Sequence, residues 1–413
     1  MEEQKICFLT KLIPYDIYEE VGKKSTNNMQ DAANALQWHL YEGFCQNYGK
    51  NVHLINILPV GSYPQYYADA FVKEGRFKTS YGDENKNVGF CNIKLLRKYN
   101  LPSKIYRALM QEFRDNDRGI LYVYTISSEF MEAVSKFKKL KPGVKVCAII
   151  ADLPNMSSLS SRNGIIKRVF IDHLADKSYK NINCIDGFVL LTEQMADYLH
   201  INKPYCVMEG ISTATEDFGE KQIDYHSKIK VILYSGTLHK RFGVMNLVNA
   251  FEKIESSEYN LVLCGSGDSE AEIIKAAARD PRIHFCGQLP RKEILELQKT
   301  ATVLVNPRQN NEEFTKYSFP SKVMEYLSSG IPVVAYKLDG VPLEYEDYLF
   351  YVEGDAISDL ARKLIEVCEM NPSDRRKHGE KGREFVLNQK NSIVQTSKIL
   401  RMVESLQTAV CYI

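Results

Sequence analysis

The stretch 306–334, NPRQNNEEFTKYSFPSKVMEYLSSGIPVV, decides how this chain can fold. The apolar runs 301–305 and 331–335, on either side of its polar part, are each typical of a buried strand. Between them Ser318 is a signal for the start of a helix, and Gly330 is a signal for its end. The sequence therefore predicts a strand, a polar loop, a short helix and a second strand, the repeat of a parallel α/β sheet.

Two charged side chains make the predicted helix a candidate binding element. The loop before it would open at the carboxyl edge of the sheet, where α/β proteins bind ligands. Lys322 and Glu325 are three residues apart and share one helix face. Beside a helix N-terminus, such a pair can hold a phosphate and a sugar hydroxyl. A solvated ion pair on a surface helix is the ordinary alternative, and this stretch alone does not separate the two.

The composition is that of a globular protein with two domains. The chain has 413 residues, of which 44% are hydrophobic and 25% are charged. The net charge of +1 gives no reason to expect a nucleic-acid partner. No run reaches the roughly 18–20 apolar residues of a membrane span. The acidic N-terminus leads directly into a predicted strand, so we expect no secretory signal and a cytoplasmic location.

The cysteines favour a reducing compartment. There are ten, without a CxxC pair, and Cys147, Cys264 and Cys286 lie inside apolar, strand-like runs. This pattern predicts reduced, buried thiols rather than disulfides or a zinc site. No histidine cluster has metal-ligand spacing and no DxD follows an apolar strand, so we expect neither a metal nor a cofactor.

The first half of the chain alternates strand-like runs with helical patterns, which predicts a first parallel sheet. The loop after the first run lacks GxGxxG, so a dinucleotide site is not expected there. Asp152 follows the strand-like run 144–150, where a side chain can point into a ligand crevice. A role as a loop cap or turn residue is an equal alternative for Asp152.

Residues 165–180 interleave basic and apolar side chains. A basic amphipathic helix can dock on an anionic membrane surface, although an internal helix with a charged outer face is the more common case. Residues 212–228 are polar and without periodicity, which predicts a linker between a first domain, 1–211, and a second domain that begins at residue 229.

The second half repeats the alternation. Its first loop, 235–243, is bounded by glycines and is basic, so backbone amides could approach an anion that Lys240 or Arg241 neutralises. Taken alone, this loop is a weak motif. The next predicted strand, 260–264, ends at Gly265.

Four segments in order resemble the donor-binding domain of retaining glycosyltransferases of family 4, which have the GT-B fold. They are YSGTLHKRFGVMNLVNAF (234–251), LVLCGSGDSE (261–270), FCGQLPRKEILELQKTATVLVNP (285–307) and YSFPSKVMEYLSSGIPVVA (317–335). The last is most similar to enzymes of bacterial surface-polysaccharide assembly.

The resemblance implies an α/β chain with two Rossmann-like, parallel-sheet domains that face each other across a cleft. Residues 1–211 would bind the acceptor and 229–388 the nucleotide-sugar donor. Residues 389–413 would form a C-terminal helix that packs back on the first domain.

The resemblance also assigns residues. The family signature is two glutamates separated by seven residues, and the second corresponds to Glu325, expected to accept hydrogen bonds from the ribose. The first falls on Tyr317, and the two family cations on the diphosphate fall on Thr237 and Phe242, so the chain departs from the pattern three times.

Nearby residues can substitute for the missing groups. Lys322 and Arg308 are the favoured cations, because they share the loop and helix with Glu325. Glu312 or Glu313 could reach the donor sugar, or both could lie in solvent. The full set expected to contact the donor, besides Lys322 and Glu325, is Gly236, Thr237, Lys240, Arg241, Gly265, Arg308, Tyr317, Ser318 and Ser321.

The activity implied is retaining transfer of a sugar from a nucleotide diphosphosugar, UDP-linked, to a glycan or lipid-linked saccharide in surface-polysaccharide synthesis. Asp152 would orient or deprotonate the acceptor. A peripheral contact with the inner face of the membrane is compatible with such an acceptor. Two alternatives stay open: a GT-B sugar-nucleotide 2-epimerase, and a catalytically silent scaffold, which the three departures from the signature would suit.

Overall fold

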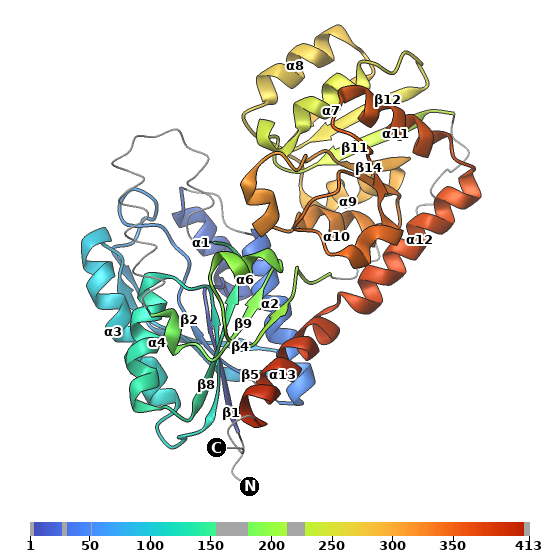
Figure 1. The fold of residues 1–413 in the computed structure, drawn as a ribbon. Coiled ribbons are helices and arrows are strands. Elements are labelled where there is room, and N and C mark those ends of the chain that lie inside the picture. The colour runs from blue at the N-terminus through green and yellow to red at the C-terminus, as the bar shows by residue number, and fades with distance from the viewer. Residues whose placement is uncertain (1–3, 27–30, 51, 154–180, 213–227, 409–413) are drawn as a thin grey trace. The chain divides into compact units, whose positions relative to one another are not determined.

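The computed structural model describes residues 4–26, 31–50, 52–153, 181–212 and 228–408 (Figure 1). The chain divides into two compact units. The first comprises Met1–Glu209 with Ser392–Ile413, and the second comprises Gly210–Asn391. The predicted amphipathic helix over 165–180 and nearly all of the predicted linker lie outside the described residues.

The first unit is built on an eight-stranded sheet with the order β10-β9-β8-β7-β1-β2-β5-β4. All neighbours pair in parallel except β4 and β5, which form an antiparallel hairpin at one edge. A small sheet joins β3 (Phe71–Val72) to β6 (Phe90–Cys91). The strands of the large sheet are β1 (Lys5–Thr10), β2 (His53–Asn56), β4 (Gly75–Thr79), β5 (Gly82–Asn87), β7 (Gly119–Tyr124), β8 (Val144–Ile150), β9 (Gly187–Leu190) and β10 (Tyr205–Val207).

The last helix of the chain, α13 (Ser392–Thr408), belongs to this first unit and packs on α2 (Asp31–Tyr48). Asn47 of α2 donates hydrogen bonds to Thr396 Oγ1 at 2.7 Å and to the Ile393 carbonyl at 2.9 Å. A Cβ on Gly43 would lie 2.4 Å from the Ser392 carbonyl oxygen, so a glycine permits this close crossing. The other described helices of the unit are α1 (Tyr18–Lys24), α3 (Lys94–Glu112), α4 (Ser128–Leu140) and α6 (Gln194–Tyr198).

The second unit contains a six-stranded, wholly parallel sheet with the order β13-β12-β11-β14-β15-β16. One buried cluster includes side chains of α7, α8 and α11, and another includes side chains of α10 and α12, so apolar packing covers both faces. The strands are β11 (Lys230–Ser235), β12 (Tyr259–Cys264), β13 (Ile283–Gly287), β14 (Val303–Asn306), β15 (Val333–Ala335) and β16 (Phe350–Tyr351). The helices are α7 (Val244–Phe251), α8 (Glu270–Arg279), α9 (Arg291–Thr300), α10 (Ser321–Ser328), α11 (Ile357–Glu369) and α12 (Pro372–Gln389).

The opening stretch of the sequence forms the elements that its pattern predicts. It contains the end of β14, a polar loop, helix α10 and the beginning of β15. Val323, Met324 and Leu327 of α10 are buried, as their helical spacing predicts.

One prediction about the cysteines is wrong. Cys147 and Cys264 are buried, but Cys286 is exposed. Cys286 lies on β13, the edge strand of the second sheet, where alternate side chains leave the core. The apolar run around it did not reveal that the strand lies at an edge.

Candidate functional site

In the second unit, the loops that follow β11 and β12 lie against each other at the carboxyl edge of the sheet. The Gly236 amide donates to the Cys264 carbonyl at 2.9 Å, and the Leu238 amide donates to the Ser266 carbonyl at 2.9 Å. Gly265 has a φ of +136°, and a Cβ there would lie 1.8 Å from the Gly236 carbonyl oxygen. Only glycine permits this approach at position 265, so the backbone itself requires Gly265.

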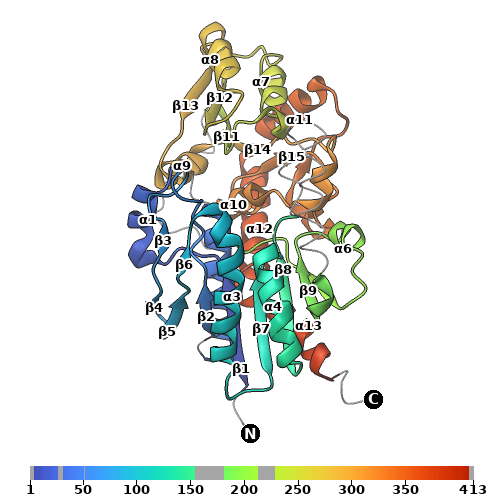
Figure 2. The ribbon, with the colours of Figure 1, turned by 90° about the vertical axis from the view of Figure 1, so that its left-hand side faces the viewer.

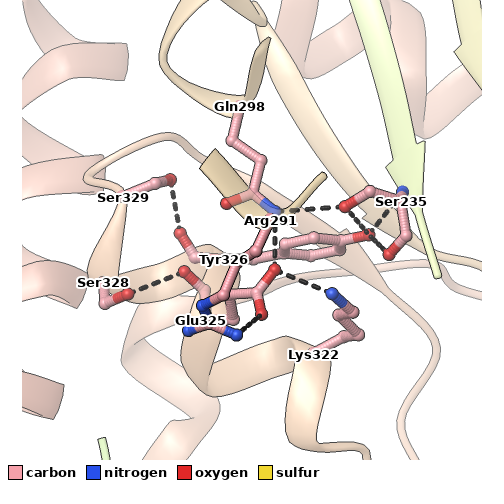
Figure 3. Close-up of polar contacts among 8 residues, drawn as sticks. All are labelled: Ser235, Arg291, Gln298, Lys322, Glu325, Tyr326, Ser328 and Ser329. Atoms are coloured by element: carbon pink, nitrogen blue, oxygen red, sulfur yellow. Dashed lines mark hydrogen bonds and ion pairs between the residues drawn. The ribbon is translucent and has the colours of Figure 1, made fainter. Parts of the chain in front are cut away.

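Helix α10 is joined to the end of β11 by one tyrosine (Figure 3). The Tyr326 hydroxyl donates to the Ser235 carbonyl at 2.9 Å and accepts from the Ser235 amide at 2.9 Å. The ring is fully buried, and this burial raises the pKa of its hydroxyl well above the ordinary value. A neutral tyrosine that satisfies both backbone groups fixes the start of α10 beside the loop after β11.

Glu325 is the centre of a polar cluster on α10 (Figure 3). Its Oε1 accepts from Lys322 Nζ at 2.8 Å and from Gln298 Nε2 at 2.7 Å, and Arg291 Nη1 lies 3.7 Å from Oε2. Burial by itself raises the pKa of the carboxyl group, but Lys322, Gln298 and Arg291 together lower it below its ordinary value of 4.5. Glu325 is therefore ionised at neutral pH, and its Oε2 accepts no protein hydrogen bond among the described residues.

Sequence reasoning missed Gln298 and Ser235. Gln298 is fully buried on α9, and its Nε2 also donates to Ser235 Oγ at 3.1 Å. Its Oε1 has no hydrogen-bond partner in the part of the chain that the structure describes. The sequence did contain one signal for Gln298. It lies three residues after Leu295, on the apolar face of a predicted helix, and a buried side-chain amide normally has a polar partner.

Lys322 is the second residue of α10 and is partly exposed. No side chain caps the N-terminus of this helix, where Pro320 is the capping residue. A Cβ on Gly236 would lie 3.7 Å from Lys322 Cε, so the lysine stem lies next to the glycine loop. Uncapped amides, the positive end of the helix dipole and an ammonium group together form a site that suits an anion.

Two arginines, Arg308 and Arg241, share the aromatic rings of Phe242 and Phe314. The Arg308 guanidinium carbon lies 4.4 Å from the ring centre of Phe242 and 5.3 Å from that of Phe314. The corresponding Arg241 distances are 5.0 Å and 5.4 Å. The position at which the resemblance would place a lysine is thus occupied by Phe242, which instead supports two cations from different loops.

Arg308 is a partly buried cation without an acidic partner among the described residues. Burial is the main cause that lowers its pKa to about 10; Arg241 lowers the pKa further, whereas Tyr234 and Glu312 act in the opposite direction. Its Nη1 lies 3.4 Å from the neutral Ser318 Oγ, and its Nε is buried without a hydrogen-bond acceptor among those residues. Arg308 remains charged at neutral pH, so a bound anion would satisfy an otherwise unpaired group.

The other predicted donor residues are less closely joined to this cluster. Lys240 is exposed, and its Nζ pairs with Glu272 on α8 at 2.6 Å, so its charge is already neutralised. Thr237 is exposed, and its carbonyl accepts from the Tyr234 hydroxyl at 2.8 Å. Ser321 is exposed at the first position of α10.

The position of the first signature glutamate lies in a short 3-10 turn, Glu313–Tyr317. Tyr317 is partly buried at the end of this turn, whereas Glu312 and Glu313 are exposed. Among the described residues, neither glutamate shares the hydrogen-bond donors of Glu325, which are Lys322 and Gln298.

Asp152 lies in the first unit, just beyond β8, whereas every other predicted site residue lies in the second unit. The residue is exposed, but partial loss of water around its carboxyl group raises the pKa above the ordinary value of 3.8. The pKa of Tyr124, at the end of β7, is raised by burial and by the charge of Asp152. The two side chains therefore lie near each other at the carboxyl edge of the first sheet.

Within the described residues, no three side chains of histidine, cysteine, aspartate or glutamate lie close enough together to hold a metal ion. Among the same residues, no helix combines the length and the apolar character needed to cross a membrane.

Solved structures define the class of fold. The chain superposes on sucrose-phosphate synthase from Thermosynechococcus elongatus with a TM-score of 0.63 and 14% identity, over 98% of this chain and 100% of that one. It superposes on α,α-trehalose 6-phosphate synthase from Burkholderia multivorans with a TM-score of 0.62 and 12% identity, over 99% of this chain and 100% of that one. The TM-score with a lipopolysaccharide outer core galactosyltransferase is 0.58 at 14% identity, over 97% of this chain and 99% of that one. The predicted GT-B fold is confirmed.

Sequence comparison then shows what the second unit is similar to. Residues 217–385 match the family described as glycosyl transferases group 1, and this range includes every predicted donor residue. D-inositol 3-phosphate glycosyltransferase from Corynebacterium kroppenstedtii is 26% identical over 160 residues, which are 35% of this chain. The match spans about a third, 34%, of that relative's length. The second unit is thus similar to group 1 glycosyl transferases over residues 217–385.

Proposed function

We propose that the protein is a retaining glycosyltransferase that moves a sugar from a UDP-linked diphosphosugar to a glycan or lipid-linked saccharide in surface-polysaccharide synthesis. The observation that carries the proposal is the ionised Glu325 beside Lys322 and the uncapped start of α10, within a region that matches group 1 glycosyl transferases. The lipopolysaccharide outer core galactosyltransferase supports the polysaccharide part by its fold and its name.

In this proposal Glu325 binds the ribose of the donor. Its Oε1 is already held by Lys322 and Gln298, which orients the carboxylate without using Oε2. An oriented, ionised carboxylate oxygen can accept a hydrogen bond from a ribose hydroxyl, and charge-assisted bonds of this kind are short and strong. Gln298 is then a positioning residue that acts through Glu325.

The diphosphate would bind to the uncapped amides of α10, to Lys322 and to the pair of Arg308 and Arg241. Transfer with retention passes through an oxocarbenium-like transition state, in which negative charge develops on the leaving diphosphate. Fixed cations and amide dipoles stabilise that charge without reorganisation. By analogy with an oxyanion-hole donor, one such cation lowers the activation barrier by about 2.7–4 kcal/mol. No step of this proposal requires a metal ion.

Asp152 is the proposed acceptor residue. A carboxylate with a raised pKa is better suited to take a proton from an acceptor hydroxyl than an ordinary aspartate. In the proposal it orients that hydroxyl and receives its proton as the new glycosidic bond forms.

The direct test is incubation of the full chain with single nucleotide sugars, with and without saccharide acceptors, in buffer that contains a chelator. Nucleotide release that depends on an acceptor, with an α-linked product from an α-linked donor by NMR, is the expected result. Isomerisation of the sugar without acceptor would replace the proposal with the 2-epimerase. Binding without turnover across the panel would replace it with the scaffold.

The site assignment has its own test. Glu325→Ala and Lys322→Ala are each expected to lower turnover at least about tenfold while circular dichroism shows a folded protein. Near-wild-type rates in both variants would refute the assignment of these residues even if transfer itself is observed.

A further inference from the structure

Helix α3 of the first unit has large apolar side chains on its outward face. Leu95, Leu96 and Tyr99 are 74%, 54% and 76% exposed. Their spacing of one and then three residues places them together on the first turns of the helix. The outward face of a surface helix is normally charged or polar, so this arrangement differs from ordinary amphipathic packing.

The inner face of α3 does not explain these side chains. Leu101, Ile105 and Leu109 are buried, and the helix packs against α4 and β6 through that opposite face. The helical period places Tyr106 and Met110 on the outward side, in continuation of the exposed leucines. Apolar residues thus follow α3 on both faces, although only one is needed for the core.

The exposed surface continues beyond the helix. Phe71 on β3 is 66% exposed, and it pairs with Cys91 on β6, just before α3 begins. Ile93, the residue before the helix, is also exposed. Figure 2 shows β3 and β6 beside the beginning of α3. We call this surface the α3 patch, and it consists of Phe71, Ile93, Leu95, Leu96 and Tyr99.

The charges that α3 itself carries are almost all positive. Helix α3 contains five basic residues and a single acidic one, Glu112, which lies at its far end and is paired with Lys5 and His53. None of the five has an ion pair with a carboxylate among the described residues, and the side chains of four of them, Lys94, Lys98, Lys104 and Arg107, also have no other hydrogen-bond partner there.

Some other surface lysines of the described chain do have acidic partners. Lys24, Lys136 and Lys240, for example, each pair with a carboxylate at 2.6–2.8 Å. Of the five basic residues on α3, Arg97 turns inward, and its Nη1 donates a hydrogen bond to the Val60 carbonyl at 2.7 Å. The α3 patch is therefore an apolar surface bordered by cations without acidic partners.

We propose that the α3 patch docks the protein on a lipid surface that carries anionic headgroups. Leucine, phenylalanine and tyrosine side chains can enter the boundary between headgroups and acyl chains. The lysine and arginine stems then extend so that their charges meet lipid phosphates.

A protein partner fits these observations less well. A stable protein interface uses roughly 20–30 residues on each side, and its buried cations need carboxylates opposite them. The α3 patch offers five apolar side chains and four cations, a scale and charge pattern that suit a membrane contact.

The position of the α3 patch suits the lipid-linked acceptor of the proposed function, and this part of the inference rests on that proposed function. Helix α3 leads into β7, so its first turn lies at the carboxyl edge of the first sheet, the edge at which Asp152 follows β8. A membrane at the α3 patch would bring a lipid-linked saccharide to the edge that carries the proposed acceptor residue.

The test is sedimentation of the full chain with vesicles of phosphatidylcholine alone or in equal mixture with phosphatidylglycerol. We expect binding to the anionic vesicles that weakens as salt is added. Leu95→Ser/Leu96→Ser/Tyr99→Ser is expected to weaken that binding at least about tenfold. Lys94→Glu/Lys98→Glu is expected to weaken binding to the anionic vesicles by a similar factor.

A matched control removes exposed apolar side chains elsewhere. Ile274→Ser/Leu343→Ser, at two exposed positions of the second unit, is expected to bind vesicles like the wild type. All substituted side chains are exposed, so the variants should fold, and unchanged turnover with a water-soluble acceptor would verify this.

Three results would overturn the inference. The first is no binding of the wild type to anionic vesicles, and the second is unchanged binding by the triple serine variant. The third is a change in sedimentation mass of that variant without lipid, which would make the α3 patch a contact between copies of the chain. Vesicle binding without any sugar transfer would instead refute the proposed function and leave the docking surface in place.

Discussion

Substitution of Lys322 by methionine separates a functional role from a structural one. The variant keeps an unbranched stem next to the glycine loop but removes the ammonium group that lies 2.8 Å from Glu325. We expect Lys322→Met to fold normally and to lose most of its transferase activity, because the cation would act on the leaving diphosphate.

The expected loss of stability is small. The Lys322 side chain is 37% exposed and that of Glu325 is 17% exposed, so water screens the pair. Partly exposed pairs of this kind contribute about 0.5–1 kcal/mol. Since about 1 kcal/mol shifts the melting temperature of a domain of this size by about 2–4 °C, the variant should melt within a few degrees of the wild type.

The expected loss of activity is much larger. A cation that stabilises developing charge on the diphosphate contributes about 2.7–4 kcal/mol, which corresponds to a fall in kcat of about 10²–10³-fold. The assay is nucleotide release under saturating donor and acceptor, together with thermal unfolding of the same preparations.

Lys363 provides a matched control in the same unit. It pairs with Glu366 three residues later on α11, also at 2.8 Å, and its helix contributes none of the predicted site residues. Lys363→Met should change stability by a similar amount and leave turnover unchanged. Equal turnover in Lys322→Met and Lys363→Met would refute the reasoning, and so would an activity loss that merely follows a large fall in melting temperature.

Four further predictions concern the same unit. Gln298→Leu removes a donor to a charged carboxylate, so UDP should bind about tenfold more weakly by calorimetry, and unchanged affinity would contradict its positioning role. Arg308→Gln should weaken UDP binding at least about tenfold but leave uridine binding unaltered, whereas an equal loss for both would place Arg308 away from the phosphates. Because the pKa of Glu325 is lowered, its stabilising charge is fully present above the ordinary value of 4.5 and is lost only as pH falls through the lower, folded-state pKa. The difference in unfolding free energy between the wild type and Glu325→Gln should therefore stay constant from pH 7 to about pH 5, and a decline within that range would be contrary to this assignment. Gly265→Ala should lower the unfolding free energy by more than about 3 kcal/mol, since its Cβ would lie 1.8 Å from a carbonyl oxygen. The control Gly287→Ala, with open space around the Cβ, should lower it by about 1–2 kcal/mol. Equal losses in the two variants would refute the steric argument.

The predicted elements of the second unit correspond closely to the observed ones, because both local signals and the global fold favour them. Val244, Leu247, Val248 and Phe251 repeat at helical spacing, and all four are buried on α7. The first unit was harder to predict between residues 60 and 118. There the structure has the hairpin of β4 and β5, whose polar sequences lack the alternation that predicts a half-buried strand.

The candidate site shows a similar division. Lys322 and Glu325 could be paired from sequence because they are three positions apart on one helix, a spacing that places two side chains on the same face. Gln298 could not be added, since it reaches Glu325 from another helix through a contact between residues 27 positions apart. Phe242 was interpreted as the loss of a cation, whereas the structure shows Arg241 and Arg308 stacked on it and on Phe314.

The sequence by itself determined the parallel α/β repeat, the carboxyl-edge loop before α10 and the ion pair within that helix, because each depends on periodicity or spacing along one segment. Only the tertiary structure decided which side chains from separate segments meet: Tyr326 with Ser235, Gln298 with Glu325, and two arginines with one aromatic pair. It also decided which apolar side chains of α3 remain exposed. The physical reason is that burial and pairing depend on the packing of whole elements, which a local pattern does not specify.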